Sequence, residues 1–246
     1  MHKGFPMRSI FWFRNDLRLH DNPGLAAAAD SSDELLLVYL WPRQRPWCNT
    51  RGIGPQRERF ISESLTELAG ALQPLGQNLL VLQGSPELVL PDLVRDYGVD
   101  ALHTSQCAGS YEQRAIRVLR ERLDVPVHEH RGNTLFSRGA IDSLGDRFPG
   151  TFSPFRRKVE QKLEPDTPGR SLPQLPKPPA VRFHAIPPAT VKPHISMPVR
   201  GGTIAGQRRL RQFLEPAGGL RSYKETRNGL DPLAGSSTLS PWLANG

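Results

Sequence analysis

The sequence predicts an α/β fold in which a doubly wound, parallel, five-stranded sheet occupies the first half of the chain. Two observations support this prediction. Short apolar runs alternate with amphipathic stretches up to about residue 131, as expected for strands joined by helical crossovers. The run at 35–40 is almost continuously hydrophobic, which is typical of a strand covered on both faces. Five strands complete a domain, which we assign to residues 1–135.

The first elements of this domain are marked by an apolar run and a helix start signal. Residues 10–13 form the first expected strand. Asp21-Asn22-Pro23 then begins a helix that continues over 24–29, because a capping residue followed by proline is typical of a helix start. The strand at 35–40 comes next.

Pro55 begins the strongest predicted helix. Its apolar residues recur at steps of four and three and therefore share one face; they are Ile61, Leu65, Leu68, Leu72 and Leu75. A second helix is expected after Gly84-Ser85-Pro86 and a third over 111–123. The remaining strands are expected at 79–82, 101–104 and 125–129.

Beyond this domain the composition changes. Ten prolines fall between residues 165 and 198, and proline removes a backbone donor and prevents regular helix. We therefore expect a connecting segment at 136–200, partly extended in polyproline fashion from about 165. The last segment, 201–246, is expected to contain a short helix with Leu210, Phe213 and Leu214 on one side.

Composition and charge limit the possible functions. The net charge of +8 and the isoelectric point near 10.0 favour a polyanionic partner such as nucleic acid, although a basic surface that serves only solubility explains them about as well. Cys48 and Cys107 lack the spacing of a disulfide framework or zinc site. No apolar run reaches membrane-spanning length, and the N-terminus lacks the apolar segment of a secretory signal. We expect a cytoplasmic protein without membrane contact.

A polar cluster follows the first predicted strand, where open α/β sheets bind ligands. It comprises Arg14, Asn15, Asp16 and Arg18, and an internal salt-bridge network explains it better than a ligand site does. Trp12 is expected in the core. No glycine-rich dinucleotide motif or Walker loop follows, which disfavours a nicotinamide dehydrogenase and a P-loop enzyme.

Other chemistry-bearing patterns are weak. His128 and His130 alternate along a predicted strand, but no third ligand has suitable spacing, so we expect no metal site. No paired carboxylates or nucleophile elbow stand out. Any chemistry is therefore expected to come from a bound cofactor.

The last residues combine a hydroxyl cluster with a helix start. Ser236, Ser237, Thr238 and Ser240 precede Pro241-Trp242-Leu243, and a serine before a proline is typical of a helix start. Hydroxyls and backbone N–H groups at such a start can bind an anion, although simple helix capping explains these residues better when they are taken alone. The helix has barely one turn before Gly246, so we expect a truncated protein.

Four motifs, in order, resemble the photolyase/cryptochrome family. They are WFRNDLRLHDNP (12–23), RERFISESLTELAGALQPLGQNLLVLQGSPE (57–87), FPGTFSPFRRKVE (148–160) and SYKETRNGLDPLAGSSTLSPWLANG (222–246). The string SYKETRNG is most similar to the cryptochrome DASH branch. The resemblance covers nearly the whole chain and thins through the proline-rich segment.

The resemblance implies an N-terminal α/β antenna domain followed by the truncated start of an all-helical FAD-binding domain. By motif match, Tyr223 corresponds to a tyrosine that contacts FAD. The phosphate-contacting stretch corresponds to Ser236, Ser237, Thr238, Leu239 and Ser240. Glu112 and Gln113 lie where the family places polar antenna-binding residues, which suggests a methenyltetrahydrofolate antenna.

The same resemblance implies a deoxyribodipyrimidine photo-lyase, in which blue light and reduced FAD repair cyclobutane pyrimidine dimers in ultraviolet-damaged DNA. Single-stranded DNA is the expected substrate because the damaged bases must leave the stack. The basic side chains of the last segment suit phosphate contact, but they could equally pair with carboxylates or flavin phosphates, and we assign none of them as a DNA contact. They are Arg200, Arg208, Arg209, Arg211, Arg221, Lys224 and Arg227.

A flavin needs enclosure on several sides, so we expect this chain, as a monomer, to be inactive alone and to retain no FAD. The terminal segment is expected to be mobile or loosely docked. Two alternatives remain: a light-signalling cryptochrome without repair activity, and a non-enzymatic α/β module that binds a folate or a nucleotide.

Overall fold

The predicted parallel sheet is present in the structure, a computed structural model that describes residues 6–41, 53–145, 150–194, 199–216, 218–229 and 235–246. Within these residues its strands are β1 (Arg8–Phe13), β2 (Glu34–Trp41), β3 (Leu79–Gln83), β4 (Ala101–Ser105) and β5 (Val127–His130). Their spatial order is β3-β2-β1-β4-β5, and every pairing is parallel. Because the order reverses at β1, the sheet is doubly wound, as predicted.

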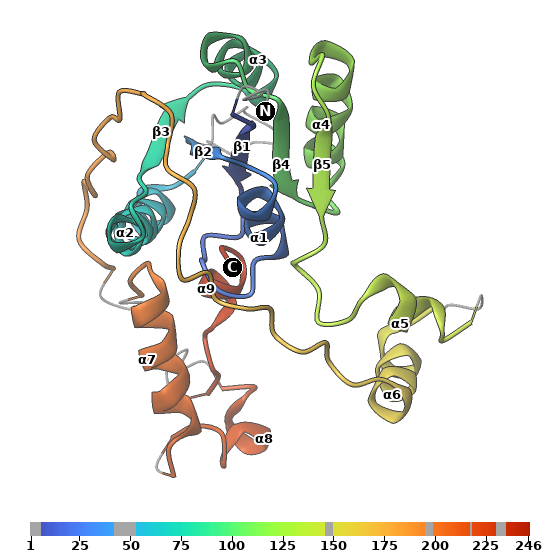
Figure 1. The fold of residues 1–246 in the computed structure, drawn as a ribbon. Coiled ribbons are helices and arrows are strands. Elements are labelled where there is room, and N and C mark those ends of the chain that lie inside the picture. Colours follow the sequence, from blue (N-terminus) through green and yellow to red (C-terminus); the bar gives the residue numbers. More distant parts are fainter. Residues whose placement is uncertain (1–5, 42–52, 146–149, 195–198, 217, 230–234) are drawn as a thin grey trace.

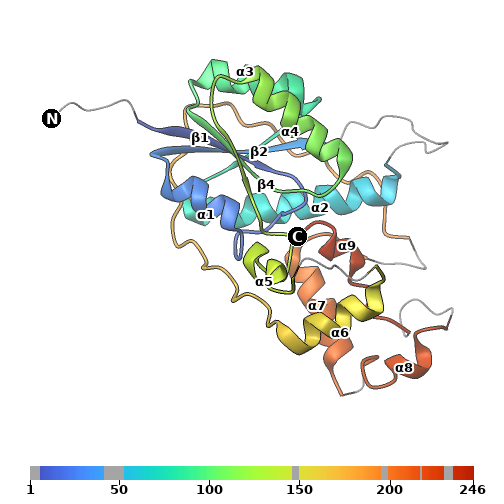
Figure 2. The same ribbon diagram turned by 90° about the vertical axis from the view of Figure 1, so that its right-hand side faces the viewer.

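Four helices cover the two faces of the sheet. They are α1 (Pro23–Asp30), α2 (Pro55–Leu72), α3 (Pro86–Tyr97) and α4 (Ser110–Arg122). Figure 2 shows α3 and α4 on one side of the sheet and α1 and α2 on the other. Alternate residues of β1 pack into the two layers: Phe11 and Phe13 lie in the core beneath α1 and α2, whereas Ile10 and Trp12 lie in the core beneath α3 and α4.

Local sequence explains where these helices begin and end. The Asn22 side chain accepts a hydrogen bond from the Leu25 N–H and caps α1, which confirms the predicted start. Pro55 and Pro86 occupy the first positions of α2 and α3. The apolar face of α2 is buried as predicted, but α2 ends at Leu72, and Leu75 lies in the short 3-10 turn η1 (Gln73–Leu75).

The described residues of the connecting segment, 136–200, contain two helices that were not predicted. They are α5 (Arg138–Asp142) and α6 (Phe152–Lys162). The proline-rich stretch beyond them packs against the α/β domain: Leu175 is buried in the core beneath α1 and α2, and the Leu35 N–H donates to the Lys177 carbonyl at 3.0 Å. This stretch therefore follows the edge of the domain (Figure 1).

The last segment contains α7 (Thr203–Leu214), α8 (Tyr223–Thr226) and α9 (Ser240–Leu243). The predicted apolar side of α7 is only partly covered, since Phe213 is buried but Leu210 and Leu214 are exposed. The Trp242 ring of α9 packs edge-on against Phe60 of α2, with 5.9 Å between ring centroids. None of the helices that the structure describes has the length and apolar character needed to cross a membrane.

Candidate functional site

A pocket of about 320 Å³ lies in the last segment of the chain. Its lining consists of Phe213, Leu220, Tyr223, Ser236, Ser237, Thr238, Leu239 and Ser240. The structure thus brings together all six residues that the family resemblance assigns to FAD, although Tyr223 and the hydroxyl stretch are more than ten positions apart in the sequence. This pocket is the candidate functional site.

The hydroxyl stretch at 236–238 has an unusual backbone. Thr238 has a φ of 54°, a left-handed conformation that is costly for a β-branched residue. Local hydrogen bonds help to hold it: the Thr238 N–H donates to Ser236 Oγ at 3.2 Å, and the Thr238 hydroxyl donates to the Ser237 carbonyl at 2.7 Å. The bend directs several hydroxyl-bearing side chains toward one pocket.

Tyr223 is positioned by α7. Its ring packs edge-on against Phe213, with 6.2 Å between centroids, and its N–H donates to the Leu220 carbonyl at 3.3 Å. The side chain remains 41% exposed. Together with the exposed Ser240, this leaves the pocket open to solvent.

The helix start next to the pocket differs in one detail from the prediction. Ser240 is the first residue of α9, its N-cap is Leu239, and no side chain caps the helix. The prediction that Ser240 caps this helix is therefore wrong, because the Leu239 carbonyl already accepts the first helical hydrogen bonds, from Trp242 and Leu243 at 3.1 Å each. With four residues, α9 adds little dipole to the pocket.

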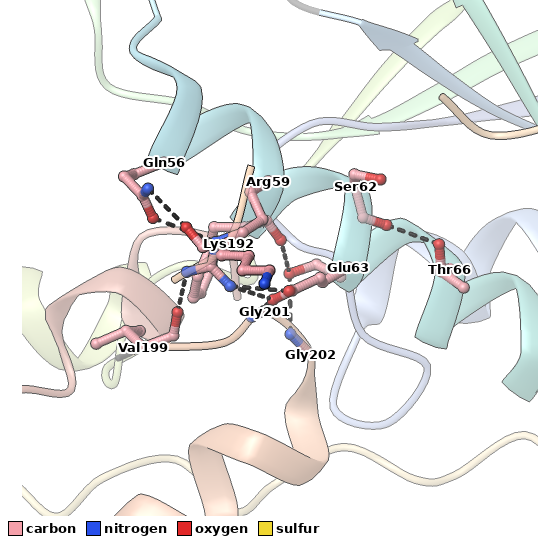
Figure 3. A network of polar contacts seen from close by, with 11 residues as sticks. Gln56, Arg59, Ser62, Glu63, Thr66, Lys192, Val199, Gly201 and Gly202 are labelled. Carbon is pink, nitrogen blue, oxygen red and sulfur yellow. Dashed lines mark hydrogen bonds and ion pairs between the residues drawn. The ribbon is translucent and has the colours of Figure 1, made fainter. Parts of the chain in front are cut away.

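The start of α7 is anchored on α2 by a polar network (Figure 3). Arg59 is buried, pairs with Glu63 at 2.8 Å and donates to the Val199 carbonyl. Glu63 accepts from the Gly201 N–H at 2.7 Å. The next amides donate to two further α2 side chains: Gly202 to Ser64 at 3.0 Å and Ile204 to Glu67 at 3.1 Å.

Glycine is required at this junction. A Cβ at Gly201 would lie 2.1 Å from the Phe60 carbonyl oxygen, and one at Gly202, where φ is 96°, would lie 2.2 Å from Glu67. The chain therefore approaches α2 as closely as its backbone allows.

A second pocket, of about 250 Å³, separates α9 from α2 and α7. Phe60, Gly206 and Trp242 contribute to its mostly apolar wall, and the Trp242 indole lies so close to Gly206 that a Cβ there would approach it to 2.9 Å. Of the predicted flavin residues only Leu239 reaches this pocket.

The carboxyl end of β1 is filled by the chain itself. Asp16 is buried and accepts hydrogen bonds from the Ser105 hydroxyl at 2.5 Å, the Arg14 N–H at 2.9 Å and the Asn22 amide at 3.3 Å. Arg18 donates to the Asp21 and Gly132 carbonyls. These residues form an internal network of hydrogen bonds and not the predicted salt-bridge network, because Arg18 donates to backbone carbonyls and Arg14 reaches Asp16 through its backbone N–H. The network occupies the position where such sheets often bind ligands.

A histidine cluster lies on β4 and β5. His103 and His130 are 3.1 Å apart between ring nitrogens, and the His103 and His128 ring centroids are separated by 4.8 Å. Burial, followed by the charges of His130 and His128, lowers the pKa of His103 to about 4. Among the described residues, no group of three or more histidine, cysteine or acidic side chains is arranged to hold a metal ion.

The predicted antenna residues lie elsewhere. Glu112 and Gln113 are exposed in the first turn of α4, and Cys107 is a free, buried thiol just before it, whose pKa burial raises. Cys48 lies outside the described residues. Both views separate α4 from α8 (Figures 1 and 2), so the folate prediction and the flavin prediction concern two different places.

One residue next to the candidate pocket was not singled out from the sequence. Arg209 of α7 donates to the Ser236 and Ser237 carbonyls and to the Thr238 hydroxyl. It appeared only as one of several arginines on a basic helix. Nothing in a single sequence distinguishes an arginine that holds a loop from its solvated neighbours.

Comparisons with known proteins show the family to which the chain is similar. The DNA photolyase family matches residues 9–179. Cryptochrome DASH from Idiomarina loihiensis is 36% identical over 96% of this chain and 54% of its own length. The "Blue-light photoreceptor PHR2" of Arabidopsis thaliana is 30% identical over 97% of this chain and 58% of its own.

A solved structure is also similar to this chain. The Synechocystis sp. cryptochrome structure matches with a TM-score of 0.82 at 31% identity, which covers 98% of this chain and 53% of that one. The chain spans about half the length of the curated relatives that it matches.

Proposed function

The chain belongs to the DNA photolyase family, and from this premise we propose that its Tyr223–hydroxyl pocket is part of the FAD site of a photolyase of the cryptochrome DASH type. In this proposal, 1–135 is the antenna domain, 136–200 connects, and 201–246 begins the flavin-binding domain. The observation that carries the proposal is the convergence of Tyr223 and residues 236–240 on one pocket.

The pocket suits the phosphate-bearing part of FAD. Its wall carries the Ser236, Ser237, Thr238 and Ser240 side chains. The serine hydroxyls can donate to phosphate oxygens, whereas the Thr238 hydroxyl already donates to the Ser237 carbonyl. The neighbouring Arg209 supplies a positive charge, which favours an anionic ligand. Tyr223 and Phe213 provide an aromatic wall at the same site.

When bound, FAD supplies the absorption of blue light and the electron that starts repair. The residues of this chain hold the cofactor: hydroxyls contact its phosphates, and Tyr223 limits its position. The proposed substrate of the whole protein is a cyclobutane pyrimidine dimer, whose two cyclobutane carbon–carbon bonds are cleaved. A single DNA strand is the preferred form, because extrusion of the damaged bases from a duplex costs a few kcal/mol.

For the antenna, we propose that Glu112 and Gln113 contact a methenyltetrahydrofolate. Both side chains are exposed at the start of α4, where a ligand can reach them. A folate titration monitored by absorbance, with a Glu112→Ala/Gln113→Ala double variant as control, tests this assignment. Equal affinity of the two proteins would refute it.

The flavin assignment predicts weak binding by this chain alone. Because the pocket is open and Tyr223 is 41% exposed, the described wall covers one side of a ligand, whereas tight sites enclose most of it. The purified chain is therefore expected to lack the flavin absorption bands, but to show FAD-induced NMR shifts at Tyr223 and 236–240 when excess FAD is added. A stoichiometric yellow protein would contradict the first expectation, and unshifted amides the second.

A second function, light signalling without repair, is favoured by the similarity to a protein named as a blue-light photoreceptor. A repair assay on ultraviolet-damaged single-stranded oligonucleotides separates the two. We expect the longer Idiomarina loihiensis relative to repair them under blue light and the 246-residue chain to show no activity. A relative that binds FAD but does not repair would favour signalling.

A further inference from the structure

Arg209 holds the hydroxyl stretch from the side of α7. Its Nη2 donates to the Ser236 carbonyl at 2.7 Å, and its Nε donates to the Ser237 carbonyl at 2.9 Å and to Thr238 Oγ1 at 3.0 Å. One guanidinium thus contacts three consecutive residues of the pocket wall. Such a fork fixes orientation as well as distance, because the donors of a guanidinium are coplanar and rigid.

These contacts determine which backbone groups face the guanidinium. The Ser236 and Ser237 carbonyl oxygens are directed at Arg209, and in a planar trans peptide the following N–H points the opposite way. The described residues contain no cis peptide, so the N–H groups of Ser237 and Thr238 are directed away from Arg209. Carbonyl oxygens, which would repel a phosphate, are thereby occupied.

The left-handed Thr238 makes this arrangement dependent on support. A β-branched residue at a φ of 54° is strained, and the surroundings must compensate for this strain. The hydrogen bond from Arg209 to the Thr238 hydroxyl is one such contact. Without it, the stretch gains by relaxing to ordinary φ values.

Arg209 itself is well placed to act as a support. It lies in the middle of α7, and the chain that enters α7 is tied to Glu63, Ser64 and Glu67 of α2 through the amides of Gly201, Gly202 and Ile204. The guanidinium is therefore anchored, through one helix, to the rigid α/β domain.

We propose that Arg209 is a positioning residue that shapes residues 236–238 to receive the pyrophosphate of FAD. This inference rests on the proposed function of the pocket and adds the group that sets its geometry. The proposal attributes the effect to the planar donors of the guanidinium and not to its positive charge. A lysine would keep the positive charge but could not bridge the three acceptors.

The test compares the wild-type chain with Arg209→Lys and Arg209→Gln, with Arg208→Gln as a control on the same helix. Arg208 is exposed, so its loss changes the helix charge equally. Circular dichroism checks the fold. Amide NMR of the ligand-free proteins reports the conformation of residues 236–238, and a titration with FAD reports the dissociation constant.

We expect both Arg209 variants to shift the 236–238 amides and to accelerate their exchange without FAD, and to raise the dissociation constant about tenfold, equivalent to ~1.4 kcal/mol. Arg208→Gln should change the constant less than about twofold. If Arg209→Lys restores wild-type loop shifts and affinity, or if Arg209→Gln leaves both unchanged, positioning by the fork is refuted.

The proposed function fails separately. If FAD shifts no amide of the wild-type pocket, the flavin assignment is wrong, and the purpose that we give to the loop is wrong with it. The ligand-free spectra still decide whether Arg209 sets the loop conformation. If instead FAD binds the wild-type pocket and the variants equally, the flavin site stands and the role of Arg209 does not.

Discussion

The junction between α2 and α7 can be broken by one methyl group. In a Gly201→Ala variant, the added Cβ would lie 2.1 Å from the Phe60 carbonyl oxygen and 2.9 Å from the Ser64 nitrogen. Both are backbone atoms inside α2, so the incoming chain must move away instead. Three amide hydrogen bonds are then lost, two of them to carboxylates.

The expected cost follows from these contacts. A net hydrogen bond contributes ~1 kcal/mol and one to a charged group ~1.5–3 kcal/mol; since Glu63 and Glu67 are partly exposed, we expect a total of about 3–4 kcal/mol in local stability. Amide exchange at 201–204 should then accelerate by about 100- to 1,000-fold.

Hydrogen exchange with residue-level detection measures this change. The core strands should keep their protection, since the α/β layers do not depend on the junction. Gly70→Ala is the matched control: Gly70 is exposed on α2, a Cβ there meets nothing within 4 Å, and the substitution should stabilise by ~0.5–1 kcal/mol. If Gly201→Ala leaves exchange at 201–204 within threefold of wild type, the tight junction does not exist.

Two further predictions concern the α/β domain. Leu65→Ala, at a fully buried position of α2, should reduce the free energy of unfolding by ~2–5 kcal/mol, whereas Leu88→Ala at an exposed position should change it by less than ~0.5 kcal/mol; urea denaturation compares them, and equal losses would contradict the packing. Burial lowers the pKa of His103 from its ordinary value of 6.5 to about 4 in the folded chain. Between these pH values the unfolded state therefore binds a proton that the folded state does not bind. The contribution of His103 to the free energy of unfolding is complete above pH 6.5 and should fall by ~1–2 kcal/mol as the pH drops toward 4. His103→Gln should flatten that dependence and His20→Gln, at an exposed position, should not; an unchanged slope in His103→Gln would refute the assignment.

Hydrophobic periodicity was sufficient to predict the sheet and its helices. The continuous apolar run in β2 reflects burial of that strand on both faces. The helical spacing in α2 reflects burial on one face, formed by Ile61, Leu65, Leu68 and Leu72. The structure confirms both. The 3-10 turn at Leu75 shows the limit of this argument. A side chain can continue a hydrophobic stripe after the helix that carries it has ended.

The proline-rich stretch was harder to interpret because several of its contacts are made by the backbone, in addition to the buried Leu175 side chain. The Lys177 carbonyl accepts from β2, and the Pro176 carbonyl accepts from Gln77. Every residue type has a carbonyl group, so no composition reveals such docking. For the described part of the stretch, proline content correctly indicated the lack of helix and strand but not the position of the chain on the domain.

For the candidate site, sequence reasoning supplied the hydroxyls but not their support. The stretch at 236–240 was recognisable from its residue types and from family resemblance. Arg209 lies 27 positions before Ser236, and its contacts depend on how α7 is placed. That placement depends in turn on two glycines and on side chains of α2, a relation that no local pattern contains.

Helix α2 therefore belongs to both parts of the molecule. Its apolar face packs on the sheet. A second stripe consists of residues spaced four apart, Arg59, Glu63 and Glu67, and the amphipathic pattern of the helix alone would predict that this stripe faces solvent. Yet Arg59 is 3% exposed and donates to the Val199 carbonyl. A buried ion pair of this kind adds little net stability, but it fixes where the next segment begins. Through α7 and Arg209 the same stripe reaches the hydroxyl loop, so the shape of the pocket depends on a helix of the α/β domain that contributes no hydroxyl to it.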